Sequence, residues 1–394
     1  MLATMVVLRA PGEVYLLRHT AGDDAVAWVE RIDPVTLEPL ERSPDLPGGP
    51  MWPGGLAAHA NGSLYVVFGR HAHRLAADCS LVCSQELPRE RPYNSFVVMP
   101  DGCIVTKDFA GALGPGTTAR SLVQPSELVV LEPDGLAIID RLPLPERSIA
   151  RLSADADQIY IVGDTSLMRV TWTADRTLQA DVGFRPRYRT LDGQTYGWDA
   201  VIEAGAAWFL DDGDGAERFI GTLRGQGTAT EPLHLVRVAL DTGAVTLTEI
   251  CGQPGGLIAN PPVVDPDRGI VVGYDTGNGV LAAFRFDEQG RTEPLWRRDQ
   301  DHGCHMVLFG DTGELVTCDH DRERSMEQVV VVDIVSGAEL ARVDTGSMVQ
   351  SVVFSAPGFE RDLYLCSLTT VTRVRVTGAP AAPTPDPPSR GDAA

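Results

Sequence analysis

The stretches GCIVTKD (102–108), GAAWFLD (205–211), GIVVGYD (269–275) and GELVTCD (313–319) share one pattern. Each begins with a glycine, continues with apolar residues that are often β-branched or aromatic, and ends with an aspartate six places after the glycine. Glycine tolerates the positive φ of a tight turn, and β-branched and aromatic residues favour strands. The pattern therefore predicts a short strand that leaves a turn and ends at an acid.

An alternating apolar stretch precedes each of these strands, and the unit recurs along the chain. Seven copies are legible, with first strands that start near Gly55, Ser95, Ile149, Asp199, Pro261, His305 and Gln350. A spacing of roughly 40 to 60 residues is typical of a four-stranded propeller blade. We therefore predict an all-β protein: a single β-propeller over residues 1–377, closed into a ring around a central channel.

The N-terminal stretch leaves two blade numbers open. EVYLLRHT (13–20) and AWVERIDPVTLEPLERS (27–43) indicate further strands. Seven blades, the favoured number, result if the two ends of the chain share the last blade. Eight result if the N-terminal stretch forms a blade of its own.

Composition narrows the functional classes. The net charge of −21 repels nucleic acid and anionic membranes, and the cations form no basic stripe. No apolar run is long enough to span a membrane, and no signal peptide or nucleotide-binding motif is present, so we expect a cytoplasmic protein without a nucleotide cofactor. The Pro/Ala-rich tail, residues 378–394, is expected to be disordered.

In a propeller the first strands begin, and the second strands end, at the same face of the ring. The sequence therefore predicts a small-molecule site at this channel mouth. Its expected substrate-binding residues are Trp52, Tyr93, Trp198, Tyr274 and His320, and its expected catalytic residues are His305, His302, Lys107 and Asp108. The repeated aspartates have a second interpretation, because an acid at a strand end commonly accepts backbone N–H bonds from the next loop.

Asn94, Asp199 and Asn260 occupy equivalent first-strand starts in different blades. Their oxygens suit a divalent ion, with Ca²⁺ or Mg²⁺ favoured over Zn²⁺ or Fe²⁺. The stretch YNSFVVMPDGCIVTKD (93–108) also resembles a motif of the gluconolactonase, paraoxonase and strictosidine-synthase-like propellers. That resemblance implies that Asn94 binds a catalytic metal or lines the pocket. These propellers usually have six blades and an N-terminal glutamate ligand, for which Glu13 and Glu30 are the available counterparts.

Two further features bear on chemistry. His302, His305, Asp319 and His320 lie on adjoining strands of one blade, where an imidazole could bind a metal, move protons or pack structurally. Alternation along a strand should point His302 and His305 to opposite faces. Lys107 is the only lysine in a chain rich in arginine, which suggests a base or an anion anchor, with a simple ion pair as the alternative.

Three functions follow from these features. The first is an enzyme that hydrolyses a lactone or ester, with a metal ion polarising the carbonyl. The second is a metal-free condensing or cyclising synthase, as in strictosidine-synthase-like propellers. The third is a propeller that binds a ligand or protein without chemistry, although the chain lacks the Gly-His to Trp-Asp signature that WD-repeat scaffolds carry in each blade. The oligomeric state is left open.

Overall fold

The computed structural model describes residues 2–52, 54–111, 123–211, 223–257, 260–303, 305–347, 354–367 and 369–375. The predicted tail, residues 378–394, lies outside them. No helix occurs in this described part, so it contains no helical segment that could cross a membrane.

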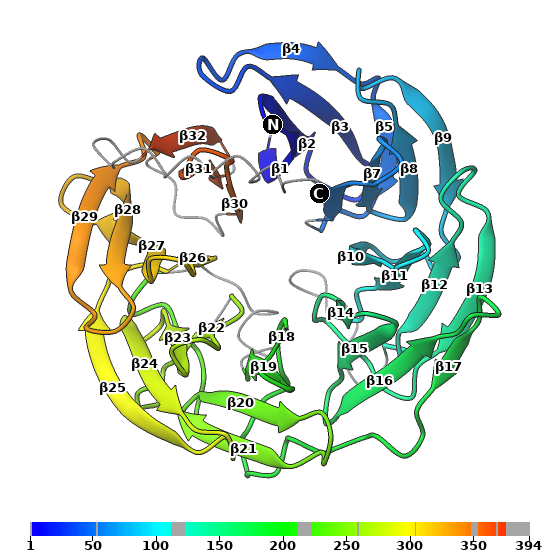
Figure 1. The fold of residues 1–394 in the computed structure, drawn as a ribbon. Helices are drawn as coiled ribbons and strands as arrows, with labels where there is room; N and C mark the ends of the chain where they lie inside the picture. Colours follow the sequence, from blue (N-terminus) through cyan, green and yellow to red (C-terminus); the bar gives the residue numbers. More distant parts are fainter. Residues whose placement is uncertain are drawn as a thin grey trace, which may run out of the picture.

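The described residues form eight antiparallel sheets arranged in a ring around a central channel (Figure 1). Within each sheet the strands follow one another from the channel outward in sequence order, except that in the first sheet β5 pairs with β3. The predicted single, closed propeller is therefore confirmed.

The first four blades comprise β1 (Leu2–Ala10), β2 (Glu13–His19), β3 (Ala25–Ile32), β4 (Pro39–Arg42) and β5 (Leu46–Gly49); β6 (Gly55–Ala58), β7 (Leu64–Phe68), β8 (His71–Leu75) and β9 (Leu81–Glu86); β10 (Tyr93–Val98), β11 (Ile104–Asp108), β12 (Glu127–Leu131) and β13 (Ile138–Pro143); and β14 (Ser153–Asp155), β15 (Gln158–Val162), β16 (Leu167–Trp172) and β17 (Leu178–Ala180). The last four comprise β18 (Val201–Glu203), β19 (Ala206–Leu210), β20 (His234–Ala239) and β21 (Val245–Glu249); β22 (Val263–Asp265), β23 (Ile270–Asp275), β24 (Val280–Phe286) and β25 (Thr292–Asp299); β26 (Val307–Phe309), β27 (Glu314–Asp321), β28 (Met326–Asp333) and β29 (Glu339–Asp344); and β30 (Phe354–Pro357), β31 (Asp362–Ser367) and β32 (Thr370–Arg375).

The blade number is eight, the alternative prediction, and not the favoured seven. The N-terminal stretch forms a blade of its own, in which β1 pairs with β2 and continues through β3 to β4. Neither end of the chain contributes a strand to the other end's sheet among the described residues.

The seam between the first and last blades is closed by packing. Ala3, Val6 and Leu16 of the first blade share a buried cluster with Tyr364 and Cys366 of the last. The Tyr364 hydroxyl donates to the carbonyl of Pro34 over 3.3 Å, and an Arg373 guanidinium nitrogen donates to the same oxygen over 3.0 Å. The ring is thus held at this point by side chains and not by a shared sheet.

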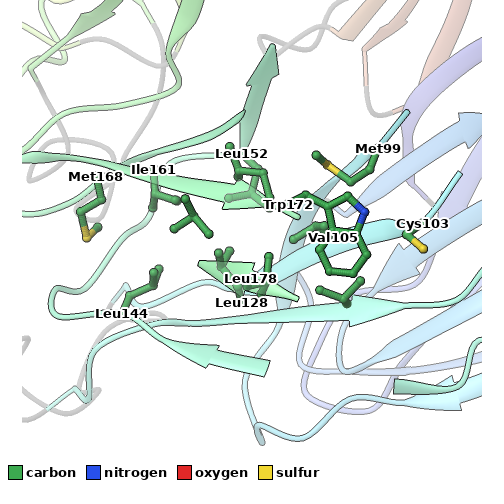
Figure 2. Packing of buried hydrophobic residues seen from close by; sticks show 13 residues of the cluster. Met99, Cys103, Val105, Leu128, Leu144, Leu152, Ile161, Met168, Trp172 and Leu178 are labelled. Atoms are coloured by element: carbon green, nitrogen blue, oxygen red, sulfur yellow. The ribbon is translucent and has the colours of Figure 1, made fainter. Parts of the chain in front are cut away.

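Neighbouring blades bury apolar side chains against each other, and strand alternation decides which neighbour each residue faces. In β11, Ile104 packs in the cluster shared with the second blade, and the next residue, Val105, packs in the cluster shared with the fourth. Figure 2 shows this second cluster, in which Val105 and Met99 lie near Trp172 and Leu152. Such two-sided burial explains why the second strands are continuously apolar.

The repeated turn has the predicted geometry. Gly102, Gly205, Gly269 and Gly313 have φ values of 85°, 68°, 61° and 75°. The aspartates at the ends of these strands accept hydrogen bonds from backbone amides, as the second interpretation of these residues predicted. Asp108 Oδ1 accepts from the Glu127 amide (2.7 Å), Asp211 Oδ1 from His234 (2.6 Å), Asp275 Oδ1 from Leu257 (3.1 Å) and Asp319 Oδ1 from Asp301 (2.8 Å).

Candidate functional site

Three charged or titratable residues precede the channel-side strands of different blades. Arg151 lies two residues before β14, Asp199 two residues before β18, and His305 two residues before β26. These strands surround the channel from the fourth, fifth and seventh blades (Figure 1). The repeat therefore brings residues that are far apart in sequence to one level of one channel.

Arg151 reaches across this channel. Its Nη1 atom lies 3.9 Å from the sulfur of Met5, which belongs to β1, three blades away around the ring. Its Nε lies 3.7 Å from Asp199 Oδ2, and its backbone amide donates to Asp199 Oδ1 over 2.6 Å. The side chain keeps 21% of its surface exposed, and burial lowers the pKa of its guanidinium.

The channel site shifts the pKa values of its members. Burial raises the pKa of the Asp199 carboxyl, although the positive charges of Arg151 and Lys107 oppose that change. Burial and the Arg151 charge lower the pKa of His305 to about 3. His305 as a residue is half-buried, and with this lowered pKa its neutral form is favoured at pH 7.

Lys107 does not line the channel mouth. Its side chain has no exposed surface, and Nζ donates to the carbonyls of Ser148 (3.1 Å) and Asp108 (3.4 Å) and to Asn94 Oδ1 (3.5 Å). Burial lowers the pKa of this amine to about 7. The three bonds tie the third blade to the start of the fourth. Asp108 directs its carboxylate elsewhere, into an ion pair with Arg91.

The three expected metal ligands have different surroundings. Asn94 Nδ2 donates to the carbonyl of Ile149 (2.7 Å) while its oxygen faces the Lys107 amine. Asp199 faces the Arg151 guanidinium. Asn260 is buried, and its Oδ1 has no hydrogen-bond partner within the part of the chain that the structure describes. Because cationic side chains already face the first two oxygens, this donor set does not fit a divalent ion well. The described residues also contain no group of three or more His, Cys, Asp or Glu side chains placed to hold a metal.

The seventh blade separates its histidines. His302 is fully buried, and its Nδ1 lies 2.5 Å from Glu327 Oε1. His320 Nδ1 lies 3.4 Å from the other oxygen of the same carboxylate. His302 and His320 thus share a buried acid inside the blade, whereas His305 belongs to the channel.

Aromatic side chains line the same end of the ring as the charged residues. Phe109, which follows β11, is buried with Ile149 and Tyr196, and the half-buried Trp52 and Trp198 pack against this group. The rings of Trp52 and Phe109 stack with centroids 4.1 Å apart and planes 23° apart. We call its four aromatic members, Phe109, Tyr196, Trp52 and Trp198, the aromatic wall.

Two of the expected substrate-binding aromatics lie elsewhere. Tyr93 is fully buried between the second and third blades, and its hydroxyl accepts from the Arg89 amide over 3.2 Å. Tyr274 is buried between the sixth and seventh blades, and its hydroxyl lies 3.4 Å from the carbonyl of Gln300. Both rings are parts of interblade cores.

Sequence reasoning missed Arg151, Phe109 and Glu327. Arg151 lies inside a stretch recognised as a first strand, at the same distance from β14 as Asp199 from β18, so blade alignment contained the signal. Phe109 follows a strand-end aspartate directly. Glu327 lies directly opposite His320 in the paired strands β27 and β28, and its other partner, His302, comes from the loop before β26. The sequence pattern did not single out this acid among the apolar residues of β28.

No protein-family model and no curated protein matches this chain. Solved structures do. BamB from Moraxella catarrhalis matches 90% of this chain and 95% of its own, with a TM-score of 0.60 and 13% identity. Sqt1 from Chaetomium thermophilum covers 93% and 94%, with a TM-score of 0.57 and 12% identity.

The periplasmic gluconolactonase PpgL of Pseudomonas aeruginosa matches 92% of this chain and 99% of its own, with a TM-score of 0.53 and 14% identity. At such low identity these likenesses show the fold alone. They place the chain among β-propellers, a class that includes lactonases, and leave its activity to be argued from the site.

Proposed function

We propose that this protein is a small-molecule enzyme that hydrolyses a lactone or ester in its central channel without a metal ion. The observation that carries the proposal is Arg151, whose guanidinium reaches from the fourth blade to Met5 of the first and lies beside Asp199. A cation and an acid with a raised pKa, held together in a channel bordered by aromatic rings, are typical of a site that activates water against a polar carbonyl.

In this proposal Asp199 is the general base. Its carboxylate takes a proton from a water molecule as that water adds to the acyl carbon, the acyl–oxygen bond breaks, and the leaving alcohol takes up a proton. The Arg151 guanidinium donates hydrogen bonds to the oxyanion that forms on the carbonyl oxygen. Neutral His305 contributes a hydrogen-bonding group, since a ring with a pKa of about 3 is too weak a base for this step at pH 7.

The metal-assisted version, with an ion held by Asn94, Asp199 and Asn260, stays a prediction. The contacts of Asn94 and Asp199 favour the metal-free version, because Lys107 and Arg151 already bring positive charge to these oxygens. The unpartnered Asn260 Oδ1 is compatible with either version, since it can accept a bond from a ligand hydroxyl.

A non-catalytic ligand-binding propeller is the second candidate. It is favoured by the internal bonding of Lys107, Asp108 and His302, which leaves these expected catalytic groups engaged within the protein. In both candidates the partner is a small molecule that enters the channel.

The test is a panel of esters and lactones offered to protein dialysed against EDTA. Asp199→Asn should lower the rate about 100-fold or more, because the general base is lost. Arg151→Gln should lower the rate by a similar factor, because the oxyanion loses its charged hydrogen-bond donor. Asp241→Asn, in an exposed turn, is the control and should leave the rate unchanged.

Two outcomes would contradict the proposal. Hydrolysis that disappears with EDTA and returns with Ca²⁺ or Mg²⁺ would restore the metal-assisted version. A ligand that binds in the channel but is never turned over would favour the second candidate.

A further inference from the structure

The last blade has fewer strands than the others. Among the described residues its sheet consists of β30, β31 and β32, whereas every other sheet has at least four strands. Figure 1 shows β32 at the outside of this blade, with the outer strands β29 and β4 in the neighbouring blades on either side. An outermost strand presents N–H and C=O groups along its outer edge. No described residue pairs with that edge of β32.

Burial shows that β32 lacks the cover that other third strands have. The third strands β12 and β20 are buried at every residue, and each lies between a second and a fourth strand. The strand β32 holds the same third position in its sheet, yet none of its residues is buried. Its two valines, Val371 and Val374, are half-buried. A further strand along this edge would bury them as in the other blades.

We infer that the outer edge of β32 is an interaction surface that takes an extended segment of a partner protein as a fourth strand. The segment pairs antiparallel with β32, and its residues alternate between apolar and acidic. Strand addition of this kind takes its affinity from main-chain hydrogen bonds and its specificity from alternate side chains. The inference is independent of the proposed hydrolysis, because this edge lies at the rim of the ring and not in the channel.

The side of this edge that faces the seventh blade is apolar. Val374 of β32 packs against a cluster that contains Val329 of the seventh blade. Val343 of the outer strand β29 lies directly opposite Val329 in the sheet, so both side chains point toward the eighth blade. Val343 nevertheless keeps 45% of its surface exposed. Every second residue of an added strand would therefore meet valines, and an apolar residue fits there.

The side that faces the first blade carries arginines. A guanidinium nitrogen of Arg373 donates to the carbonyl of Pro34 in the first blade. Arg375 lies two residues further along β32 and therefore on the same side. Its side chain is 58% exposed, and the carboxylate of Glu360 lies 3.9 Å from its Nη2. An acidic residue on the added strand would give Arg375 a closer partner.

Complete blades of this ring pair opposite charges between their third and fourth strands. In the first blade, Arg31 of β3 lies 3.3 Å from Glu41 of β4. In the third blade, Glu127 of β12 lies 2.7 Å from Arg141 of β13. The same arrangement in the eighth blade requires a carboxylate on the fourth strand.

The residues that follow β32 in the chain are poor donors for such a strand. Residues 376–394 lie outside the described part, and their sequence contains Pro380, Pro383, Pro385, Pro387 and Pro388. Proline has no amide hydrogen, so this sequence offers few of the main-chain donors that a fourth strand supplies. We therefore assign the added strand to a partner, and removal of residues 378–394 distinguishes the two sources.

The experiment is a titration of a fluorescently labelled peptide, acetyl-Gly-Val-Glu-Val-Glu-Val-Gly-amide, with the full chain at 0.15 M ionic strength. A second peptide carries lysines in place of the glutamates. We expect the glutamate peptide to bind about fivefold to tenfold more tightly, because the lysines face Arg375 as like charges. General attraction to a chain of net charge −21 would favour the lysine peptide, so it cannot produce this preference.

Hydrogen exchange locates the bound peptide. The glutamate peptide should slow amide exchange in β32, because its carbonyls accept from the outer edge of that strand, and should leave exchange in β13 unchanged. Arg375→Glu should weaken binding about tenfold, and Val343→Asp should weaken it several-fold. The matched controls are Arg297→Glu and Val82→Asp, which change exposed residues on the outer strands of complete blades and should leave binding unaltered.

Four outcomes would overturn the inference. The first is tighter binding of the lysine peptide, and the second is binding that leaves exchange in β32 unaltered. The third is a peptide that binds only after residues 378–394 are removed, since the tail would then occupy the edge. The fourth is a dimer in sedimentation whose dissociation speeds exchange in β32, since a second copy would then cover this strand.

Discussion

His73 shows how a single buried side chain links stability to pH. The residue has no exposed surface, and its Nε2 lies 2.8 Å from the carbonyl of Pro47, an acceptor only, so Nε2 carries the proton. Nδ1 accepts from the Ser84 hydroxyl over 2.8 Å. Both ring nitrogens are satisfied in the neutral form, and burial lowers the pKa to about 4.

We therefore expect acid to destabilise the fold through His73. The unfolded chain binds a proton at the ordinary pKa of 6.5, whereas the folded chain binds it only near pH 4, so stability is present above 6.5 and falls as the pH drops through this window. The loss amounts to about 3 kcal/mol. Urea unfolding at several pH values measures the free energy of unfolding. Between pH 6.5 and 4 this free energy should fall less steeply with decreasing pH in His73→Gln than in the unaltered protein.

The control for this measurement is His59→Gln, a change at a half-buried histidine that bonds to the carbonyl of Gly102. An unchanged slope in His73→Gln would show that His73 does not cause the acid sensitivity.

At the scale of elements, the strand-end aspartate acts as a clamp between consecutive strands of a blade. Asp211 accepts from both the amide and the Nδ1 of His234, the first residue of β20, and from the Nε2 of Gln194 over 2.9 Å. This carboxylate therefore fixes the end of β19 to the next strand and to the loop before the blade. Its role is structural, although it lies at the face where we expected chemistry.

Asp211→Ala should lower the free energy of unfolding by about 2 to 4 kcal/mol, since it leaves a buried amide and two side chains without their acceptor. Chemical denaturation measures this loss. Asp241→Ala, in the exposed turn after β20, should cost less than about 0.5 kcal/mol. If Asp211→Ala lowers the free energy of unfolding no more than Asp241→Ala does, Asp211 does not stabilise the blade in this way.

The same elements show what the sequence could predict. Glycine turns and strand-end aspartates lie within six residues of each other, so local chemistry alone identifies the blades. The choice between seven and eight depends on how Ala3 and Leu16 meet Tyr364, a contact between the two ends of the chain. No local pattern encodes it.

The site was predictable to the same limited extent. The equivalence of the blades was enough to predict that Asp199 and His305 lie at the channel. It could not predict that the Lys107 side chain points between two blades and donates to the carbonyl of Ser148. Side-chain direction depends on the β-bulge that interrupts the register between Tyr93 and Ser95, and a bulge leaves no clear sign in one sequence.

At the scale of the whole molecule, a ring of net charge −21 surrounds a channel that holds the Arg151 cation. The two charges act over different distances. The summed negative charge is felt by an approaching ion at long range, whereas the guanidinium acts once the ligand lies inside the channel. An anionic ligand is therefore repelled before it is bound.

We expect salt to speed the binding of an anionic ligand, for which 2-naphthoate serves as the probe. The screening length falls from about 30 Å at 0.01 M to about 8 Å at 0.15 M ionic strength, so salt removes the long-range repulsion before it weakens the contact with Arg151. Stopped-flow mixing with 2-naphthoate should show an association rate constant that rises several-fold over this range. For neutral 2-naphthalenemethanol the rate constant should not change, because no net charge approaches the ring. Slower association of naphthoate at higher salt would mean that the positive field of the channel already dominates outside its mouth, and that the acidic surface does not govern how ligands arrive.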